Sequence, residues 1–416
     1  MKKILGLKCI SCGKEIENAE YACPSCSGNL DVVYDYKSIA KSFGKKDLAA
    51  NGDYSIWRYL PILPMDSLKR IPSLKIGVTP LSHIPRLNDE LGINNLFFKD
   101  DTKLPSASFK DRASSVTVVV GLEKGKEIFT TASTGNAGCA LACMSANMGM
   151  QSIILVPKTA PRAKIAQILL YGARVIAVNG TYDDAYDLSL KASERFGWYN
   201  RSTGYNPYTR EGKKTVALEI AEQMAWDVPD YVFVPVGDGN IISGTWKGFM
   251  DLYRLKWIER LPKLIAVQSD KSDSITKSFE AAKNTASRGG AADIKIIPVQ
   301  ATTIADSISV DLPRDGISAV KAIIESKGDA VRVSDQEILN SIKYLAQKTG
   351  IFAEPAGVAS FAGFLKMFRD KKISSTSKMV CLVTGNGLKD IDSALKVSGS
   401  PEIIDPQISE LEKIIK

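Results

Sequence analysis

Histidine is the scarcest informative residue in this chain of 416 residues, because it occurs only once, as His83. Mechanisms that need two histidines, and metal centres rich in histidine, are therefore excluded. Long apolar runs are also absent: the longest, around residues 116–122, is far shorter than the roughly 20 residues of a membrane-spanning helix. The basic start, Met1-Lys2-Lys3, is not followed by the apolar stretch of a secretion signal, so we expect no signal peptide and no membrane partner.

Runs of five or more basic residues are missing as well, and the net charge of +8 comes from 54 Lys and Arg against 46 Asp and Glu. Spread over this length, the excess does not favour nucleic acid as a partner, whereas an anionic small substrate fits. The 44% of apolar and 24% of charged residues are typical of a folded globular protein. The seven cysteines are odd in number and four stand in Cys-x-x-Cys pairs, which indicates the reducing cytoplasm rather than a disulfide scaffold.

A cysteine module occupies about the first 30 residues and contains two Cys-x-x-Cys pairs, formed by Cys9, Cys12, Cys23 and Cys26. Two such pairs brought together supply four thiolates in the tetrahedral arrangement that zinc prefers. Four sulfur ligands close the coordination shell, so we predict a structural zinc site without a catalytic position. Iron as the metal, four unligated thiols and a redox pair are the alternatives.

Strand-like and helix-like segments alternate from about Leu74 onward. The predicted strands are 95–100, 128–131, 152–156, 174–178, 231–236, 264–268 and 379–383. The predicted helices are 164–171, 183–196, 215–224, 244–253 and 336–349. This alternation predicts βαβ units and parallel sheets that are covered by helices on both faces.

Lys110 lies in the first of four segments that follow predicted strands, the position at which open α/β sheets bind ligands. Ser108 can cap a helix that begins with Phe109, which puts Lys110 in the first turn of that helix. The positive end of the helix disfavours an ammonium group and lowers the lysine pKa, as a Schiff-base nucleophile requires. Taken alone, the pattern fits a solvated helix lysine better.

The other three segments offer backbone N–H groups and hydroxyls. Residues 131–138 (T-A-S-T-G-N-A-G) form either a nest for a carboxylate or phosphate or only a helix cap. Residues 235–241 (P-V-G-D-G-N-I) can bind a phosphate, but they match neither the Walker motif nor the dinucleotide fingerprint, which disfavours an NAD-dependent oxidoreductase. Residues 383–390 (V-T-G-N-G-L-K-D) have a hydroxyl at a strand end and two glycines that allow close approach of the backbone to a ligand. The alternative is that they form only a turn.

Taken together, these segments resemble the fold type II family of pyridoxal phosphate (PLP) enzymes, and within it the threonine synthases. The motifs S-F-K-D-R, S-T-G-N-A-G, the glycine loop after P-V-G, and T-G-N-G-L-K-D occur in the family's order, and G-V-T-P-L at 77–81 and E-P-A at 354–356 also match. The resemblance covers about residues 75–395. The cysteine module is similar to the N-terminal extension of some threonine synthases.

The resemblance implies a two-domain α/β architecture with PLP in the cleft between the domains. Both domains are three-layered with mostly parallel sheets, and the zinc-ribbon-like module is appended to them. The expected boundaries are 1–35 for the module, 36–123 with 202–416 for the large domain, and 124–201 for the small domain. We also expect a homodimer.

The same resemblance assigns roles to single residues around the cofactor. Lys110 matches the lysine that holds PLP and later moves protons, and Asn136 matches the side chain that hydrogen-bonds the cofactor's O3′. Thr384 matches the hydroxyl that faces the pyridine nitrogen. The loop for the cofactor phosphate corresponds to Gly237, Asp238, Gly239, Asn240 and Ile241.

Substrate-binding residues are implied in the same way. The loop that receives the substrate carboxylate corresponds to Ser133, Thr134 and Gly135. Arg210 resembles the arginine that binds the substrate phosphate, since a guanidinium can pair with phosphate through two hydrogen bonds. The alternative for Arg210 is a surface ion pair with Glu211 or another carboxylate.

The implied reaction converts O-phosphohomoserine and water to L-threonine and phosphate. A threonine or serine dehydratase, or an O-phosphoserine-dependent synthase, would use the same loops, and a non-catalytic PLP- and zinc-binding adaptor is a remote alternative. Two departures from the family bear on the substrate. The G-D-G-N loop is shorter than in many threonine synthases and puts Asp238 near a phosphate, and residues 304–314 replace an I-R-I-G-N-P stretch.

Overall fold

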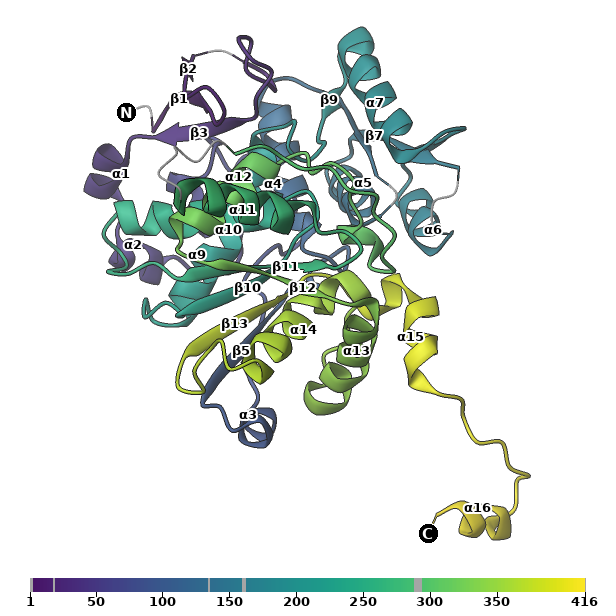
Figure 1. Ribbon diagram of the computed structural model, residues 1–416. Coiled ribbons are helices and arrows are strands. Elements are labelled where there is room, and N and C mark those ends of the chain that lie inside the picture. Colours follow the sequence, from purple (N-terminus) through teal and green to yellow (C-terminus); the bar gives the residue numbers. More distant parts are fainter. Residues whose placement is uncertain (1–2, 18, 134, 159–161, 288–293, 416) are drawn as a thin grey trace.

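The computed structural model describes residues 3–17, 19–133, 135–158, 162–287 and 294–415. Within these ranges the strands form three separate sheets (Figure 1). The largest sheet takes strands from both sides of the smaller parallel sheet in the sequence, so the smaller sheet is an insertion. The third sheet belongs to the N-terminal cysteine module.

The large sheet has the strand order β12-β11-β10-β13-β5-β4, and all neighbours are parallel except β4, which is antiparallel to β5. Its strands are β4 (Leu81–His83), β5 (Asn95–Asp100), β10 (Tyr231–Pro235), β11 (Lys263–Ser269), β12 (Asp329–Val333) and β13 (Lys378–Val383). Val232 and Val234 pack into one apolar core, whereas Phe233 between them packs into a second core on the other face. This alternation shows that both faces of the sheet are buried.

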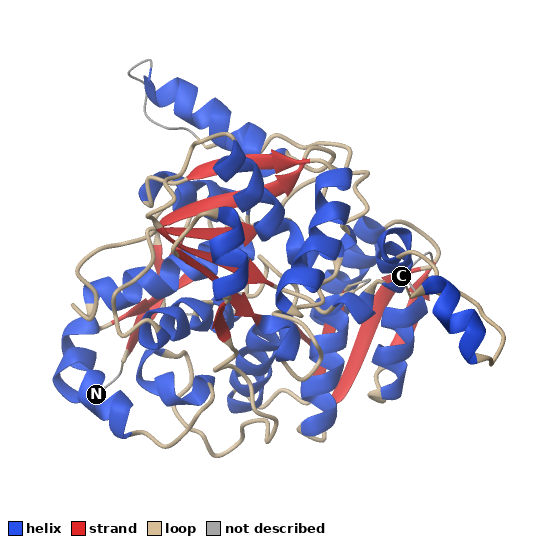
Figure 2. Cartoon of the chain, turned by 90° about the horizontal axis from the view of Figure 1, so that it is seen from below, coloured by secondary structure: helices blue, strands red, loops and turns tan. Residues whose placement is uncertain are grey.

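Helices cover the large sheet on both sides, as Figure 2 shows. The side that carries Val232 and Val234 is covered by helices that include α9 (Thr215–Gln223), α10 (Asn240–Arg254), α11 (Ser274–Ser287) and α12 (Gly316–Glu325). The opposite side carries α3 (Pro85–Leu91), α13 (Asp335–Thr349) and α14 (Pro355–Arg369), and α15 (Ile391–Ser398) packs on α13. Two further helices, α4 (Lys110–Glu123) and α8 (Tyr208–Lys213), pack against each other.

The small sheet has the order β8-β7-β6-β9 and is parallel throughout. Its elements are β6 (Ile128–Ala132), α5 (Asn136–Asn147), β7 (Gln151–Pro157), α6 (Arg162–Leu170), β8 (Arg174–Val178), α7 (Tyr182–Phe196) and β9 (Tyr199–Asn200). Ile153 and Leu155 of β7 pack with α7, whereas Ile154 and Val156 join the core that contains α5 and α6. These elements lie inside the segment 124–201 that the resemblance assigns to a small domain.

The cysteine module forms an antiparallel sheet of order β2-β1-β3 at one corner of the molecule (Figure 1). Its strands are β1 (Ile4–Cys9), β2 (Glu15–Ile16) and β3 (Leu30–Tyr34). The remaining elements are α1 (Tyr36–Ser42), α2 (Lys45–Ala50), η1 (Ile56–Ile62), η2 (Asp101–Lys103), η3 (Asp306–Ile308), η4 (Gly387–Lys389) and α16 (Ile408–Ile414), which stands away from the body of the molecule. None of the described helices combines the length and apolar character that crossing a bilayer requires.

The predicted α/β class is confirmed, and each predicted strand ends within one residue of an observed strand. Helix ends differ more, because α10 begins at Asn240 inside the glycine loop rather than at Gly244. Three strands outside the cysteine module, β4, β9 and β12, were not predicted. β9 has only two residues, and β12 interrupts its apolar residues with Asp329 and Arg332, so neither forms an apolar run.

A buried cluster of charges ties the start of α4 to its surroundings. Arg112 has no exposed surface, and its guanidinium donates to Asp101 at 2.6 Å and to Glu219 at 2.5 Å. Lys99 also contacts Glu219, at 2.7 Å. Because Asp101 follows β5 and Glu219 lies in α9, this cluster joins three elements and holds the helix that begins with Lys110.

Replacing Arg112 by Leu should lower the free energy of unfolding by about 3–5 kcal/mol, because the buried carboxylates of Asp101 and Glu219 lose their cation. The control is Arg260→Ala, whose half-exposed guanidinium pairs with Asp227 and Asp230 and should change stability by less than about 1 kcal/mol. Urea unfolding followed by circular dichroism measures both effects. Equal midpoints for the two variants would contradict the role given to the cluster.

Candidate functional site

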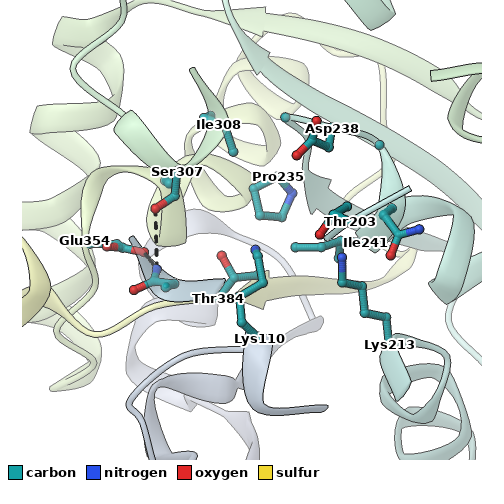
Figure 3. Close-up of a pocket in the computed structure, with 15 residues that line it drawn as sticks. Lys110, Thr203, Lys213, Pro235, Asp238, Ile241, Ser307, Ile308, Glu354 and Thr384 are labelled. Carbon is teal, nitrogen blue, oxygen red and sulfur yellow. Dashed lines mark hydrogen bonds between the residues drawn. The ribbon is translucent and has the colours of Figure 1, made fainter. Parts of the chain in front are cut away.

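A cavity lies where several strands of the two sheets end, and residues from all four predicted segments line it. Its lining includes Lys110, which follows β5, Asn136, which follows β6, and Thr384, which follows β13. The whole predicted phosphate loop also lines it, namely Gly237, Asp238, Gly239, Asn240 and Ile241. Figure 3 shows the Lys110 and Thr384 side chains pointing into this space.

Backbone pairing holds Lys110 beside Thr384. The Phe109 N–H donates to the Thr384 carbonyl at 2.9 Å, and the Asn386 N–H donates to the Ala107 carbonyl at 3.0 Å. These bonds flank an antiparallel bridge between residues 108 and 385. Lys110 then begins α4 as its first residue, so two motifs far apart in the sequence are fixed as one unit.

The Lys110 amine is prepared for nucleophilic chemistry. Burial of the amine, followed by the positive charge of Arg201, lowers its pKa to about 8, although Glu354 and Asp238 act in the opposite direction. The sequence predicted the direction of this shift, but the main cause is burial rather than the end of the helix. Among the described residues, the Lys110 amine has no hydrogen-bond or ion-pair partner, so it is free to react.

The glycine loop forms an anion site at the start of α10. A Cβ atom at Gly237 would lie 2.9 Å from the Ile308 Cα, and Gly239 has a φ of +90°, so both positions require glycine. The first N–H groups of a helix have no partner within the helix, and the close-fitting glycine loop leaves those of α10 open to a ligand. The buried amine of Lys213 lines the same cavity and can donate hydrogen bonds to an anion there.

Asp238 departs from the usual loop, and the structure shows how its carboxyl group is accommodated. Asp238 Oδ1 accepts the backbone N–H of Arg314 at 3.1 Å. Burial raises the pKa of Asp238, and burial together with the positive charge of Lys110 lowers the pKa of Lys213 well below its ordinary value. The charges of Lys213, Arg314 and Lys110 act in the opposite direction on the pKa of Asp238.

A second cavity adjoins the first and shares Lys110 and Asn136 with it. Ser133 and Gly135, two predicted carboxylate-binding residues, line this cavity. The Gly135 N–H donates to the Ser133 hydroxyl at 3.2 Å, at the start of α5. Thr134, the third predicted member of that loop, lies outside the described residues.

The structure adds site residues that the sequence did not assign. Asn136 donates to Glu354 Oε1 at 2.5 Å and to Ser307 at 3.4 Å, and burial raises the pKa of Glu354. The sequence pointed to Glu354 only through its place in the E-P-A motif, which gave it no role. Arg201 lines the second cavity, and it follows the two-residue strand β9, which no pattern marks.

Arg210 is placed elsewhere, which corrects the expectation that it faces the substrate. It lines neither of the two cavities. Its guanidinium contacts Asp315 at 2.6 Å and Asp31 of the cysteine module at 3.0 Å. The alternative role, an ion pair, is the one observed, although the pair is buried and does not involve Glu211.

Asp315 connects this ion pair to the glycine loop. Its Oδ1 accepts from Arg210 and, at 3.0 Å, from Asn29 of the module. Its Oδ2 accepts from Asn240 and Ser243, both at 2.7 Å. The N-terminal module therefore helps to hold the first turn of α10.

Several buried polar atoms around the cavities lack hydrogen-bond partners in the described part of the chain. They are Asn136 Oδ1, Asn240 Oδ1, Glu354 Oε2 and Arg201 Nη2. Unpaired buried polar atoms are rare in proteins, and a cluster of them beside a cavity indicates a polar ligand. A reactive amine, an anion cradle and a hydroxyl then define what that ligand must contain.

Comparison with known proteins agrees with this geometry. The family model for "Pyridoxal-phosphate dependent enzyme" matches residues 72–385. The chain is 39% identical to threonine synthase of Methanocaldococcus jannaschii over 98% of this chain and 99% of that protein. The chain belongs to the PLP-dependent enzymes, among the threonine synthases. It is also 36% identical to threonine synthase of Methanosarcina acetivorans, over 98% of both chains.

A solved structure shows the same fold. The processed form of threonine deaminase isoform 2 from Solanum lycopersicum is 25% identical, with a TM-score of 0.64 over 77% of this chain and 87% of that chain. Nearly full-length matches therefore go to threonine synthases and include the cysteine module, whereas this structural match covers a smaller share of the chain.

The residues of the first cavity fit PLP. Lys110 offers an unpaired amine for the aldehyde, and the glycine loop and the Lys213 amine offer hydrogen-bond donors for the phosphate. Thr384 offers a hydroxyl at the cavity wall. The unpaired oxygens of Asn136 and Asn240 are the polar atoms that a bound cofactor or its ordered water would satisfy.

Uptake of PLP by the cofactor-free protein should accelerate as the pH rises to about 8 and then level off, because only the neutral amine of Lys110 attacks the aldehyde. Stopped-flow absorbance in the visible range measures the rate. A rate that keeps rising toward the ordinary lysine pKa of 10.5 would contradict the lowered pKa. Lys110→Ala is the control, and it should show no covalent visible band after dialysis.

Proposed function

We propose that this protein converts O-phosphohomoserine and water to L-threonine and inorganic phosphate. The observation that carries the proposal is the pair of adjoining cavities that share Lys110, the first suited to PLP and the second to an anionic amino acid. The near full-length similarity to threonine synthases supports it.

Lys110 is the residue that moves protons. When bound, PLP supplies an electron sink that stabilises negative charge on the substrate carbons. Lys110 Nζ removes the proton from the substrate Cα and then helps to remove one from Cβ. Its pKa of about 8 lies close to neutral pH, where an amine can both accept and return a proton efficiently.

The other residues of the site orient the substrate and set the protonation of the cofactor ring. The backbone at Ser133 and Gly135 lies at the start of α5, where N–H groups and the helix dipole favour the substrate carboxylate. The Thr384 hydroxyl can donate as well as accept, so it does not force a proton onto the ring nitrogen, as a carboxylate would. The role of Thr134 stays a prediction.

Ammonia release from threonine or serine is the second candidate, because a threonine deaminase shares the fold. Hydroxy amino acids carry one anionic group, whereas the second cavity offers both the start of α5 and a buried arginine, Arg201. Asp238 and Asp306 also line this cavity, but Asp306 pairs with Lys164 and burial raises the pKa of Asp238, so Arg201 is available for a second anionic group of the substrate.

The purified PLP-loaded protein should release phosphate and threonine in equal amounts from O-phosphohomoserine. Its kcat/KM for this substrate should exceed that for threonine deamination by about 100-fold or more, because the phosphate adds a charge-assisted interaction. Phosphate, amino-acid and ammonia assays on phosphohomoserine, phosphoserine, threonine and serine measure this, with Lys110→Ala as the inactive control. Ammonia from threonine as the main product would sink the proposal.

We further propose that the cysteine module binds structural zinc. The sulfur atoms of Cys9, Cys12, Cys23 and Cys26 all lie within 4.8 Å of one another. A Cβ atom at Gly28 would lie 3.0 Å from Cys9 Sγ, so the chain around the sulfurs is tightly fitted. Four sulfurs fill a tetrahedral shell and leave no position for substrate.

The protein as isolated should contain one zinc ion per chain, and Cys12→Ser should lose it. The control is Cys143→Ala, which removes a buried thiol outside the cluster and should keep the metal. Atomic absorption measures the metal content. Four thiols that titrate rapidly in the folded protein, with no metal, would contradict the proposal, and iron would correct its identity.

None of the seven cysteines forms a disulfide in the structure. This fits a reducing compartment, and we propose the cytoplasm. The homodimer stays a prediction.

A further inference from the structure

Arg201 is a buried arginine without a carboxylate partner. It has no exposed surface, and among the described residues no carboxylate forms an ion pair with it. Its Nε donates to Ser114 at 3.0 Å and its Nη1 to Thr203 at 3.2 Å, while Nη2 has no partner. Arg112 and Arg210, which are also buried, each contact two carboxylates. A buried charge without an ion-pair partner lowers stability, and the anionic group of a ligand would compensate it.

The position of Arg201 in the fold puts its guanidinium beside the Ser133 loop. Its backbone N–H donates to the Thr130 carbonyl of β6 at 2.8 Å, directly after β9. β6 and β9 are parallel neighbours, and the Ser133 loop follows β6. The guanidinium and that loop therefore lie at the same edge of the small sheet, and both line the second cavity.

A comparison of the cations around the two cavities leaves Arg201 as the one that is available to an anion in the second cavity. Lys213 lines only the first cavity, beside the glycine loop. Lys164 contacts Asp306 at 2.5 Å and Glu354 at 3.7 Å, so its charge is compensated. Among the described residues that line the second cavity, Arg201 and Lys110 are the cations, and Asp238 and Asp306 are the carboxylates. Asp306 is paired with Lys164, burial raises the pKa of Asp238, and the Lys110 amine is committed to the cofactor. Burial lowers the pKa of Arg201 to about 10, so the guanidinium remains charged at neutral pH.

We propose that Arg201, with the Thr203 hydroxyl beside it, binds the phosphate group of the substrate in the second cavity. This inference rests on the proposed function and replaces the role that the sequence gave to Arg210. The start of α5 is left for the carboxylate, so the two anionic ends of the substrate have separate partners.

The same contact assists the chemistry. As the substrate loses a proton from Cβ to Lys110, the Cγ–O bond breaks and its electron pair leaves on the phosphate oxygen. Arg201 stabilises the charge that develops on that oxygen through charge-assisted hydrogen bonds. It also makes the site selective, because an unphosphorylated amino acid leaves the guanidinium unpaired.

The test is calorimetric titration of the PLP-loaded protein and of its Arg201→Gln variant with inorganic phosphate and, separately, with L-threonine. PLP fills the glycine loop, so phosphate reports on the second cavity. Loss of the guanidinium should weaken phosphate binding by about 10- to 100-fold. Threonine affinity and the visible absorption of the cofactor should stay unchanged. Arg201→Lys, which keeps the charge but not the planar fork, should recover part of the phosphate affinity.

Stability separates this role from a structural one. Removing an unpaired buried charge should leave the thermal midpoint of Arg201→Gln equal to that of the wild type or raise it. A structural arginine would instead lower the midpoint and weaken both ligands together. That result would overturn the proposal.

The remaining outcomes are equally decisive. Unchanged phosphate affinity in Arg201→Gln, or no phosphate binding by the wild type, overturns the inference. Weaker threonine binding with intact phosphate binding would make Arg201 a carboxylate anchor and overturn it as well. Turnover of O-phosphohomoserine by the wild type is measured separately, so the proposed function can stand when the inference fails. Phosphate affinity that depends on Arg201 without this turnover would instead contradict the proposed function.

Discussion

The short backbone pairing between residues 107–109 and 384–386 is the contact on which the site depends. It joins the segment after β5 to the segment after β13, two neighbouring parallel strands, and thereby sets the Lys110 amine beside the Thr384 hydroxyl. Neither segment could do this alone, because each is a loop at a strand end. The amine lies in a buried cavity as a consequence of this pairing, and burial is the largest cause of its lowered pKa.

The buried cations away from the cavities and those around them differ in their carboxylate partners. Away from the cavities, the buried cations Arg112 and Arg210 each contact two carboxylates. Around the cavities, Lys110, Lys213 and Arg201 have no carboxylate at ion-pair distance among the described residues. Such groups lower stability in the absence of ligand, and they interact strongly with an anion that enters, because little water competes. The cations that face the two cavities are thus available to a bound anion, whereas Arg112 and Arg210 are not.

Sequence predicts the parts of this protein that local pattern determines. β-Branched runs place the buried strands, and the S-F-K-D-R and T-G-N-G-L-K-D motifs place Lys110 and Thr384 at strand ends. The direction of a long side chain is different, since it depends on what packs against its helix. Arg210 turns toward Asp31 of the cysteine module, and nothing in its own segment reveals that neighbour. Arg201 follows a strand of only two residues, too short for any periodicity.

The cysteine module is connected to the site through Arg210 and Asp315. Asn29 and Asp31 of the module reach Asp315 and Arg210, and Asp315 in turn accepts from Asn240 at the start of α10. A carboxylate with both oxygens occupied in this way has little freedom, so the first turn of α10 keeps its N–H groups aimed at the cavity. A module outside both cavities can thus preorganise the phosphate loop, which gives a physical reason for the cysteine module beside a PLP fold in this chain.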